Sequence, residues 1–182
     1  MSVENIETDD LYERIERARA VIAARAPVTP RVGLILGSGL GALGDELADG
    51  VAVPYTDIPG FPRSTVVGHR GELAIGRLGG QPVAVMRGRF HFYEGYSMQQ
   101  VTFPVRVLRA LGCDTLLVTN AAGGVRDDWQ VGDLMRITDQ IFLPGMAGYH
   151  PLRGANDDRL GPRFPARFGA YDPELGRVAH TV

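Results

Sequence analysis

Two short apolar runs, each followed at once by glycine or other small residues, limit most strongly what this chain can fold into. The first covers residues 32–36 and enters G-S-G-L-G at 37–41. The second covers residues 115–119 and enters N-A-A-G-G at 120–124. Continuous apolar runs of this length are typical of strands that are buried on both faces. The pattern therefore predicts an α/β protein.

A hairpin and an N-terminal helix accompany these runs. Residues 73–78 and 82–85 are strand-like, and the glycine pair at 79–80 suits a tight turn between antiparallel strands. Asp10 can cap a helix whose apolar residues recur at helical spacing as far as Pro27. With the two apolar runs, these elements predict a central mixed β-sheet flanked by helices; the three-layer α/β fold expected here is what the family resemblance described below implies.

The rest of the chain alternates between further elements and a long irregular stretch. Residues 143–170 show no period, and a loop of that length is usually functional or part of an interface. We expect one domain over residues 1–182, incomplete at its C-terminus because its last helix stops after about ten residues. The predicted elements are helices over 42–48 and 97–111, a strand over 131–139 and a helix opened by Asp172 and Pro173.

Composition excludes several classes of function. Hydrophobic residues make up 45% and charged residues 22% of the chain, as in a globular protein. A net charge of −2 offers no basic field for nucleic acid or for a membrane surface. No run approaches the ~18 apolar residues of a membrane span. The single cysteine, Cys113, cannot form an internal disulfide, which favours a reducing compartment such as the cytoplasm.

The segment G-R-F-H-F-Y-E-G-Y at 88–96 holds the strongest candidate site. Arg89, His91 and Tyr93 alternate, so an extended backbone would place all three on one face. The two phenylalanines between them would then point into the core. A guanidinium, an imidazole and a phenol side by side suit an anion attached to a sugar. Taken alone, the segment fits an edge strand with a solvated polar face equally well.

The small residues after the two apolar runs suggest where an anion would bind. A strand, a glycine-rich turn and a helix together form an anion cradle, to which Ser38 adds a hydroxyl. Small residues at 120–124 let a ligand approach the backbone closely. Ligands of open α/β sheets bind at the carboxyl ends of strands. We therefore expect residues 37–41, 89–93 and 120–124 to converge on one site.

Three other patterns are weaker. Read from Gly39, G-L-G-A-L-G matches the dinucleotide-binding motif, but no acidic residue ends the next predicted strand. His69 lies between glycines in a connection, where it is either exposed and idle or close to the same pocket. His91 and Glu94 are three apart like a pair of metal ligands, but a single pair is poor support for a metal site.

Together these residues resemble the trimeric, low-molecular-mass purine nucleoside phosphorylases, over nearly everything after Arg31. The resemblance implies phosphorolysis of nucleosides such as inosine and guanosine, in purine salvage. It implies a homotrimer with sites at subunit interfaces, and no metal or organic cofactor. The matching strings are L-G-S-G-L-G at 36–41, G-H at 68–69, G-R-F-H-F-Y-E-G-Y at 88–96, T-N-A-A-G-G at 119–124, V-G-D at 131–133, P-L-R-G-x-N-D at 151–157, R-F-P at 163–165 and A-Y-D at 170–172.

The resemblance also implies roles for particular residues. Arg89 and His91 would be the catalytic residues, because they position phosphate for attack. Purine contacts would lie mostly beyond Val182, where family members continue. The remaining implied roles are phosphate binding by Ser38, His69, Arg89, His91 and the Ala121 N–H, ribose binding by Tyr93 and by Phe164 of a neighbouring subunit, and lining of the pocket by Gly37, Gly39, Asn120 and Gly123.

Three alternatives stay open at this stage. Within the family, a methylthioadenosine phosphorylase is the nearest rival, although R-F-H-F-Y-E-G-Y at 89–96 favours the purine nucleoside branch. The residues that would distinguish the two by their base preference lie in the part beyond Val182. A non-catalytic phosphate- or nucleoside-binding protein is the second alternative, since the chain resembles only the phosphate and ribose half of the site. An NAD-binding fragment is the weakest.

Overall fold

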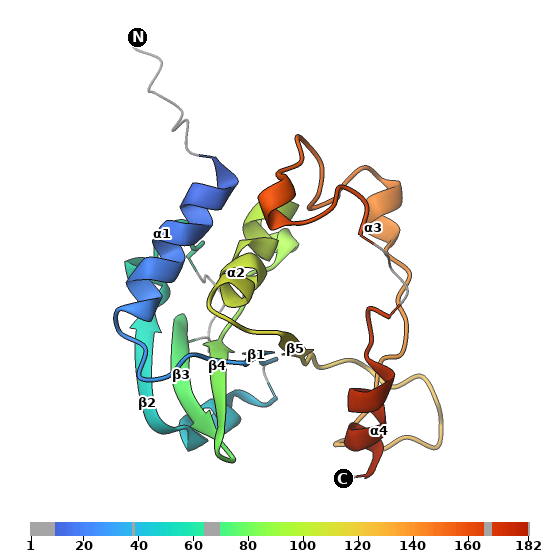
Figure 1. Cartoon of the computed structure of the whole chain (residues 1–182). Coiled ribbons are helices and arrows are strands. Elements are labelled where there is room, and N and C mark those ends of the chain that lie inside the picture. Colours follow the sequence, from blue (N-terminus) through green and yellow to red (C-terminus); the bar gives the residue numbers. More distant parts are fainter. Residues whose placement is uncertain (1–9, 38, 64–69, 166–168, 182) are drawn as a thin grey trace. The chain divides into compact units, whose positions relative to one another are not determined.

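The computed structural model describes residues 10–37, 39–63, 70–165 and 169–181 (Figure 1). The chain divides into two compact units, Met1–Ala121 and Ala122–Val182. We call them the N-terminal unit and the C-terminal unit and describe each by itself. A single domain over the whole chain stays a prediction.

A five-stranded mixed sheet forms the centre of the N-terminal unit, in the order β2-β3-β4-β1-β5. β1 pairs in parallel with both β4 and β5, whereas β2, β3 and β4 pair antiparallel. The predicted mixed sheet is therefore confirmed, as is the β3–β4 hairpin. The strands are β1 (Val32–Ile35), β2 (Ala48–Pro54), β3 (Glu72–Leu78), β4 (Gln81–Arg87) and β5 (Thr115–Val118).

Two helices of 13 residues, α1 (Leu11–Ala23) and α2 (Met98–Ala110), lie together on one face of this sheet (Figure 1). Each begins where the sequence predicts. The Asp10 carboxylate accepts from an N–H of the first turn of α1, and Ser97 caps α2. No helix in the described ranges is long and apolar enough to span a bilayer. The α-helix predicted over 42–48 is wrong: Gly41–Glu46 forms a 3₁₀ helix, η1.

Alternate residues of β1 face different layers. A Cβ atom on Gly33 would lie 3.2 Å from the Leu108 side chain of α2, so this face of the strand packs against the helices. Leu34 and Leu36 face the other way. They belong to a buried cluster with Ala74, Val83 and Val85, against which Leu43 and Leu47 pack from η1 and its end. The N-terminal unit thus has three layers: α1 with α2, the sheet, and the η1 segment.

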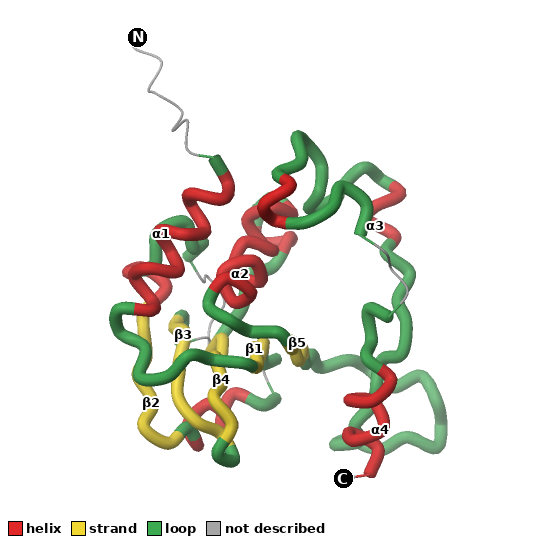
Figure 2. Tube along the Cα trace, in the orientation of Figure 1, coloured by secondary structure: helices red, strands yellow, loops and turns green. Residues whose placement is uncertain are grey.

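The C-terminal unit is mostly irregular, with the short helices α3 (Leu143–Met146), η4 (Asp158–Leu160) and α4 (Pro173–Thr181) (Figure 2). The helix predicted from Asp172 is confirmed, since this carboxylate accepts two N–H groups of its first turn. The strand predicted over 131–139 is wrong. Gln130 and Asp133 close a turn there, and the unit's described residues contain no strand that could pair with this stretch.

Candidate functional site

The carboxyl ends of β4, β1 and β5 lie along one edge of the sheet, because these three strands are parallel neighbours. Gly37 follows β1, Arg89 follows β4 and Asn120 follows β5. Contacts between these connections, described below, show that they meet. Gly37, Arg89 and Asn120 thus follow neighbouring strands and lie close together at this edge. That residues 37–41, 89–93 and 120–124 form one site stays a prediction.

Thr119 joins the three segments. Its hydroxyl accepts the Gly37 N–H at 2.8 Å, and its carbonyl accepts from the Arg89 guanidinium at 2.6 Å. A Cβ atom on Gly37 would lie only 2.9 Å from the Thr119 carbonyl oxygen, so glycine is needed for this approach. Thr119 is not among the site residues that the sequence predicts. The available signal is a hydroxyl residue that ends an apolar run directly before a run of small residues.

Arg89, His91 and Glu94 form a hydrogen-bonded chain. Arg89 Nε donates to His91 Nε2 at 3.0 Å, and His91 Nδ1 lies 2.7 Å from Glu94 Oε1. Because Arg89 Nε can only donate, His91 Nε2 accepts, and the ring proton lies on Nδ1. The nearly buried Glu94 carboxylate also accepts the His91 backbone N–H at 2.9 Å. Glu94 therefore fixes both the tautomer and the orientation of the imidazole.

The same contacts explain why His91 and Glu94 are three residues apart. Glu94 faces the His91 ring as a hydrogen-bond acceptor, the usual partner of an oriented histidine. The described ranges contain no group of three or more His, Cys, Asp or Glu side chains that could hold a metal ion. The spacing of the two residues thus reflects a capped turn.

The extended backbone expected for residues 89–93 ends at His91. Residues Phe92–Glu94 form a 3₁₀ helix, η3, which closes at Gly95 with a φ of 94°. As a result Phe92 is 42% exposed, and its predicted place in the core is wrong. Phe90 is 4% exposed, as predicted. An extended pattern cannot pass a turn that a left-handed glycine and a capping glutamate impose.

Tyr93 lies beside His91, as predicted, but the backbone between them forms a turn and not the extended segment that the pattern predicts. Its ring stacks on the imidazole, with 4.7 Å between ring centroids and 18° between planes. The tyrosine is 76% exposed. The phenol therefore lies on the solvent-exposed side of His91, where it can reach a ligand bound next to this residue.

The remaining predicted residues divide between the two units. Asn120 donates its side-chain amide to the Ala121 carbonyl at 3.1 Å, and a Cβ atom on Gly39 would meet open space. Ser38 and His69 lie outside the described residues. Gly123 and Phe164 belong to the C-terminal unit, where the Phe164 ring is 86% exposed and lies 5.5 Å from the Arg163 guanidinium.

Charged residues fasten the segment after the glycine turn to β4. Arg87 contacts Glu72 at 2.8 Å and Asp45 at 3.2 Å, and it also donates to the Gly44 carbonyl. Arg70 pairs with the same Asp45 carboxylate through both of its Nη atoms. These pairs hold η1 close to the residues that lead into Arg89, and so support the shape of the cradle.

The topology does not suit the dinucleotide alternative. The motif needs an α-helix that opens at the last glycine and returns to a parallel strand beside β1. Here the glycines lead into the 3₁₀ helix η1, and the following strand, β2, pairs only with β3 at the far edge of the sheet.

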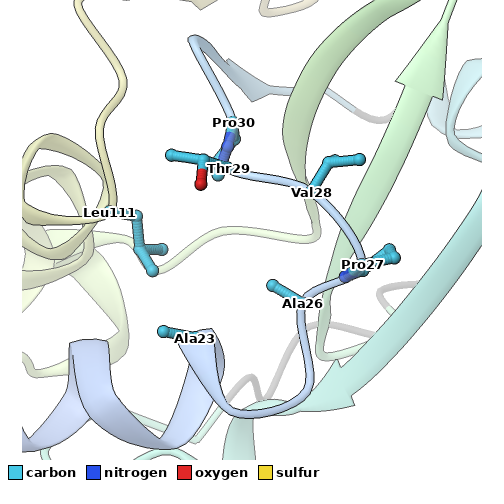
Figure 3. Close-up of a pocket in the computed structure, with 7 residues that line it drawn as sticks. All are labelled: Ala23, Ala26, Pro27, Val28, Thr29, Pro30 and Leu111. Carbon is cyan, nitrogen blue, oxygen red and sulfur yellow. The ribbon is translucent and has the colours of Figure 1, made fainter.

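A small hollow of about 180 Å³ lies elsewhere in the N-terminal unit (Figure 3). It is lined by Ala23, Leu111 and residues 26–30, which lead into the amino end of β1. None of these side chains is charged, so the hollow contains no cationic group that could bind an anion. The candidate site is the cluster at the carboxyl ends.

The fold and the site together define an α/β protein that presents an arginine, a histidine and backbone groups at the carboxyl edge of parallel strands. Groups of these kinds can bind an anionic ligand. The sequence model of the Phosphorylase superfamily matches residues 31–182. The chain belongs to this superfamily.

Curated relatives support the same conclusion. The chain is 54% identical over 172 residues to purine nucleoside phosphorylase 1 of Bacillus subtilis, covering 94% of this chain and 62% of the relative. It is 49% identical over 177 residues to the purine nucleoside phosphorylase of Rattus norvegicus, covering 97% and 61%. The chain thus spans about three fifths of the length of the relatives that it matches.

Solved structures give the same fold. An isoform 2 purine nucleoside phosphorylase from Schistosoma mansoni, in complex with cytosine and ribose-1-phosphate, aligns with a TM-score of 0.87 and 42% identity. The match covers 93% of this chain and 60% of that one. A Schistosoma mansoni purine nucleoside phosphorylase in complex with inosine aligns with a TM-score of 0.86 and 43% identity, covering 93% and 59%. The predicted fold class is confirmed.

Proposed function

We propose that this chain provides the phosphate- and ribose-binding part of a purine nucleoside phosphorylase, a pentosyltransferase. The observation that carries the proposal is the cluster of Arg89, His91 and Thr119 at the shared carboxyl edge of three parallel strands. A phosphate that replaces the present partners of Arg89 would gain charge-assisted hydrogen bonds, each worth about 1.5–3 kcal/mol. Membership of the superfamily and the names of the relatives support the same reaction.

In this reaction a phosphate oxygen forms a bond to C1′ of the nucleoside. The glycosidic bond between C1′ and the purine nitrogen breaks, and its electron pair leaves with the base, which takes up a proton. The products are the free base and ribose 1-phosphate, or deoxyribose 1-phosphate. Arg89 and His91 act by holding the attacking phosphate in place, which removes much of the entropic cost of bringing two substrates together.

Glu94 is a further residue of the proposed site. It holds the His91 ring so that Nε2 lies beside the Arg89 guanidinium. A phosphate that binds Arg89 would then meet the edge of the imidazole, where its P–OH group can donate to Nε2. The carboxylate is therefore proposed as a positioning residue, which acts through His91.

The other residues complete the proposed site. The neighbouring-subunit role of Phe164 implies a homotrimer, and its exposed ring supports such a contact. Phosphate would also be held by Ser38, His69 and the Ala121 N–H, and ribose by Tyr93 and the neighbour's Phe164. The pocket would be lined by Gly37, Gly39, Asn120 and Gly123.

We further propose inosine and guanosine as substrates, with inorganic phosphate as co-substrate and no metal or organic cofactor. The complex of the Schistosoma mansoni relative with inosine supports this choice of substrate. The role would be purine salvage in the cytoplasm, where the lone Cys113 stays reduced.

A non-catalytic phosphate- or nucleoside-binding protein is the second candidate. It is favoured by the proposed roles of the described residues, which concern phosphate and ribose and not the purine base. Such a protein would bind phosphate at the same cluster and would release no base.

The test is release of hypoxanthine from inosine by this chain, with and without phosphate, alongside calorimetric titration of phosphate. Release that requires phosphate, and that Arg89→Ala abolishes, is the expected result. Phosphate binding without release would support the second candidate. Release at the same rate without phosphate, or neither binding nor release, would contradict the proposed function.

A further inference from the structure

The chain changes direction between β4 and Arg89 at a single glycine. Gly88 has a φ of 112°, a conformation that residues with a Cβ rarely adopt. The strand pairing ends one residue earlier, where Glu72 stands opposite Arg87. Gly88 lies beyond the last residue pair of β3 and β4. The direction of the Arg89 side chain therefore depends on the other contacts that fix Gly88.

Tyr55 holds it. The tyrosine follows β2 and its hydroxyl donates to the Gly88 carbonyl at 2.7 Å. The side chain is 2% exposed. Burial raises the pKa of this phenol well above its ordinary value, and the nearby Glu72 carboxylate raises it further. The hydroxyl is thus a permanent donor at physiological pH.

The ring of Tyr55 holds the other neighbour of Arg89. Its centroid lies 5.1 Å from that of Phe90 and 5.4 Å from that of Phe61. Gly88 and Phe90 flank Arg89 in the sequence. One is therefore fixed by the hydroxyl of Tyr55 and the other by its ring.

Backbone bonds bring a third segment to the same point. The Tyr55 N–H donates to the Gly71 carbonyl at 2.8 Å, and the Gly71 N–H donates to the Arg87 carbonyl at 3.0 Å. These bonds do not involve the tyrosine side chain. Removal of the hydroxyl alone would leave them, and the ring contacts, in place, which makes its role separable from that of the residue as a whole.

We propose that Tyr55 is a positioning residue for phosphate binding: its hydroxyl, through the Gly88 carbonyl, aims the Arg89 guanidinium at the site. This inference rests on the proposed function, in which Arg89 holds phosphate. Nothing in the sequence pattern marks Tyr55, because its partner is 33 residues away.

The experiment compares Tyr55→Phe with Phe103→Leu in the full chain. Phe103 is buried in the same aromatic cluster, 6.0 Å from Phe61, and takes no part in the site. The readout is hydrogen exchange of the Arg89 Nε–H by NMR, assigned with Arg89→Lys, together with phosphate affinity. In Tyr55→Phe we expect both the exchange rate and the phosphate dissociation constant to rise about tenfold, as for the loss of one hydrogen bond.

Phe103→Leu should lower the melting temperature at least as much and change neither quantity by more than about twofold. Unchanged Arg89 exchange in Tyr55→Phe, or an equal rise in Phe103→Leu, would overturn the inference. Titration of the unmodified chain with phosphate separates the two proposals. If phosphate moves neither the Arg89 nor the His91 signals, the proposed function fails, whereas the exchange comparison still decides whether Tyr55 aims Arg89.

Discussion

The two units of the chain both match the superfamily, yet they bury their side chains very differently. The N-terminal unit has a core in which residues such as Leu73, Val85 and Phe103 are at most 2% exposed. None of the described residues of the C-terminal unit is buried, and Val131 and Leu134 are almost fully exposed. Ordering a residue's backbone costs about 1–2 kcal/mol, which apolar burial must offset. Family resemblance therefore shows where residues match, and burial shows which of them hold the fold.

The largest expected difference is in backbone hydrogen exchange. Amides of β1, β3 and β4 should exchange at least ~10³-fold more slowly than those of the described residues of the C-terminal unit, because opening them requires the core to unfold. Mass-spectrometric or NMR exchange at neutral pH measures this directly. Protection over 122–163 equal to that of β4 would mean that burial is not what separates the two units.

A matched pair of leucines tests the same difference as free energy. Leu73→Ala, in β3, should lower the free energy of unfolding by about 2–5 kcal/mol, because it empties space in a packed core. Leu134→Ala, at a residue 91% exposed, should change it by no more than about 0.5 kcal/mol. Chemical denaturation followed by circular dichroism gives both values. Similar losses for the two variants would contradict the assignment of the core.

The sequence predicts the N-terminal unit better than the C-terminal one for the same physical reason. Apolar runs next to glycine or other small residues identify β1, β5 and the β3–β4 hairpin. The burial predicted for the second run is wrong, because Leu116, Leu117 and Val118 of β5 are 44–55% exposed. The run at 131–139 looks similar but has no partner strand among the described residues, and forms none.

Within the site, the sequence predicts contacts between residues close together in the chain better than contacts between residues far apart in it. The sequence predicts that Arg89 and His91 lie together because they are two residues apart, and their hydrogen bond confirms this contact. Thr119 was missed because its contact with Gly37 spans 82 residues, and Tyr55 for a similar reason. Phe92 is predicted in the core but is 42% exposed, because Glu94 and Gly95 turn the chain, a local effect that overrides alternation.

Arg89 of the N-terminal unit is proposed to bind phosphate and Phe164 of the C-terminal unit to bind ribose, so variants of these two residues should affect different substrates. Arg89→Ala should raise the dissociation constant for phosphate by about 10- to 100-fold, equivalent to one or two charge-assisted bonds, and change nucleoside binding little. Arg77→Ala, at an exposed arginine of β3, is the control and should change neither. Calorimetry with each substrate measures the effect. Equal losses for phosphate and nucleoside would contradict the role of Arg89.

Phe164→Ala tests the corresponding residue of the C-terminal unit. Loss of an aromatic contact with the sugar should raise the apparent KM for inosine about fivefold, with the KM for phosphate and the melting temperature unchanged. The ring is 86% exposed, so its removal should cost the fold almost nothing. Phe142→Ala, in the same unit, serves as the matched aromatic control. An unchanged KM for inosine would remove Phe164 from the site.

The smallest expected effect concerns one ion pair in each unit. Arg31 holds the pKa of Asp114 below its ordinary value through a hydrogen bond, with Thr115 adding to the effect, and Arg126 does the same for Asp128. The two pairs differ in sequence separation. Arg31 and Asp114 are 83 residues apart, whereas Arg126 and Asp128 are two residues apart.

Unfolding should therefore separate the first pair and leave the second close together. In urea the pKa of Asp114 should rise towards its ordinary value, whereas that of Asp128 should move less. A carboxyl whose pKa is lower in the folded state stabilises that state above its unfolded pKa, and this contribution is lost as the pH falls through the folded value. Asp114 should thus contribute to acid unfolding and Asp128 should hardly do so. Carboxyl titration by NMR, with and without urea and with Arg31→Gln as a control, measures both. Equal rises in urea would show that the Arg126 pair, like the Arg31 pair, is held by the fold.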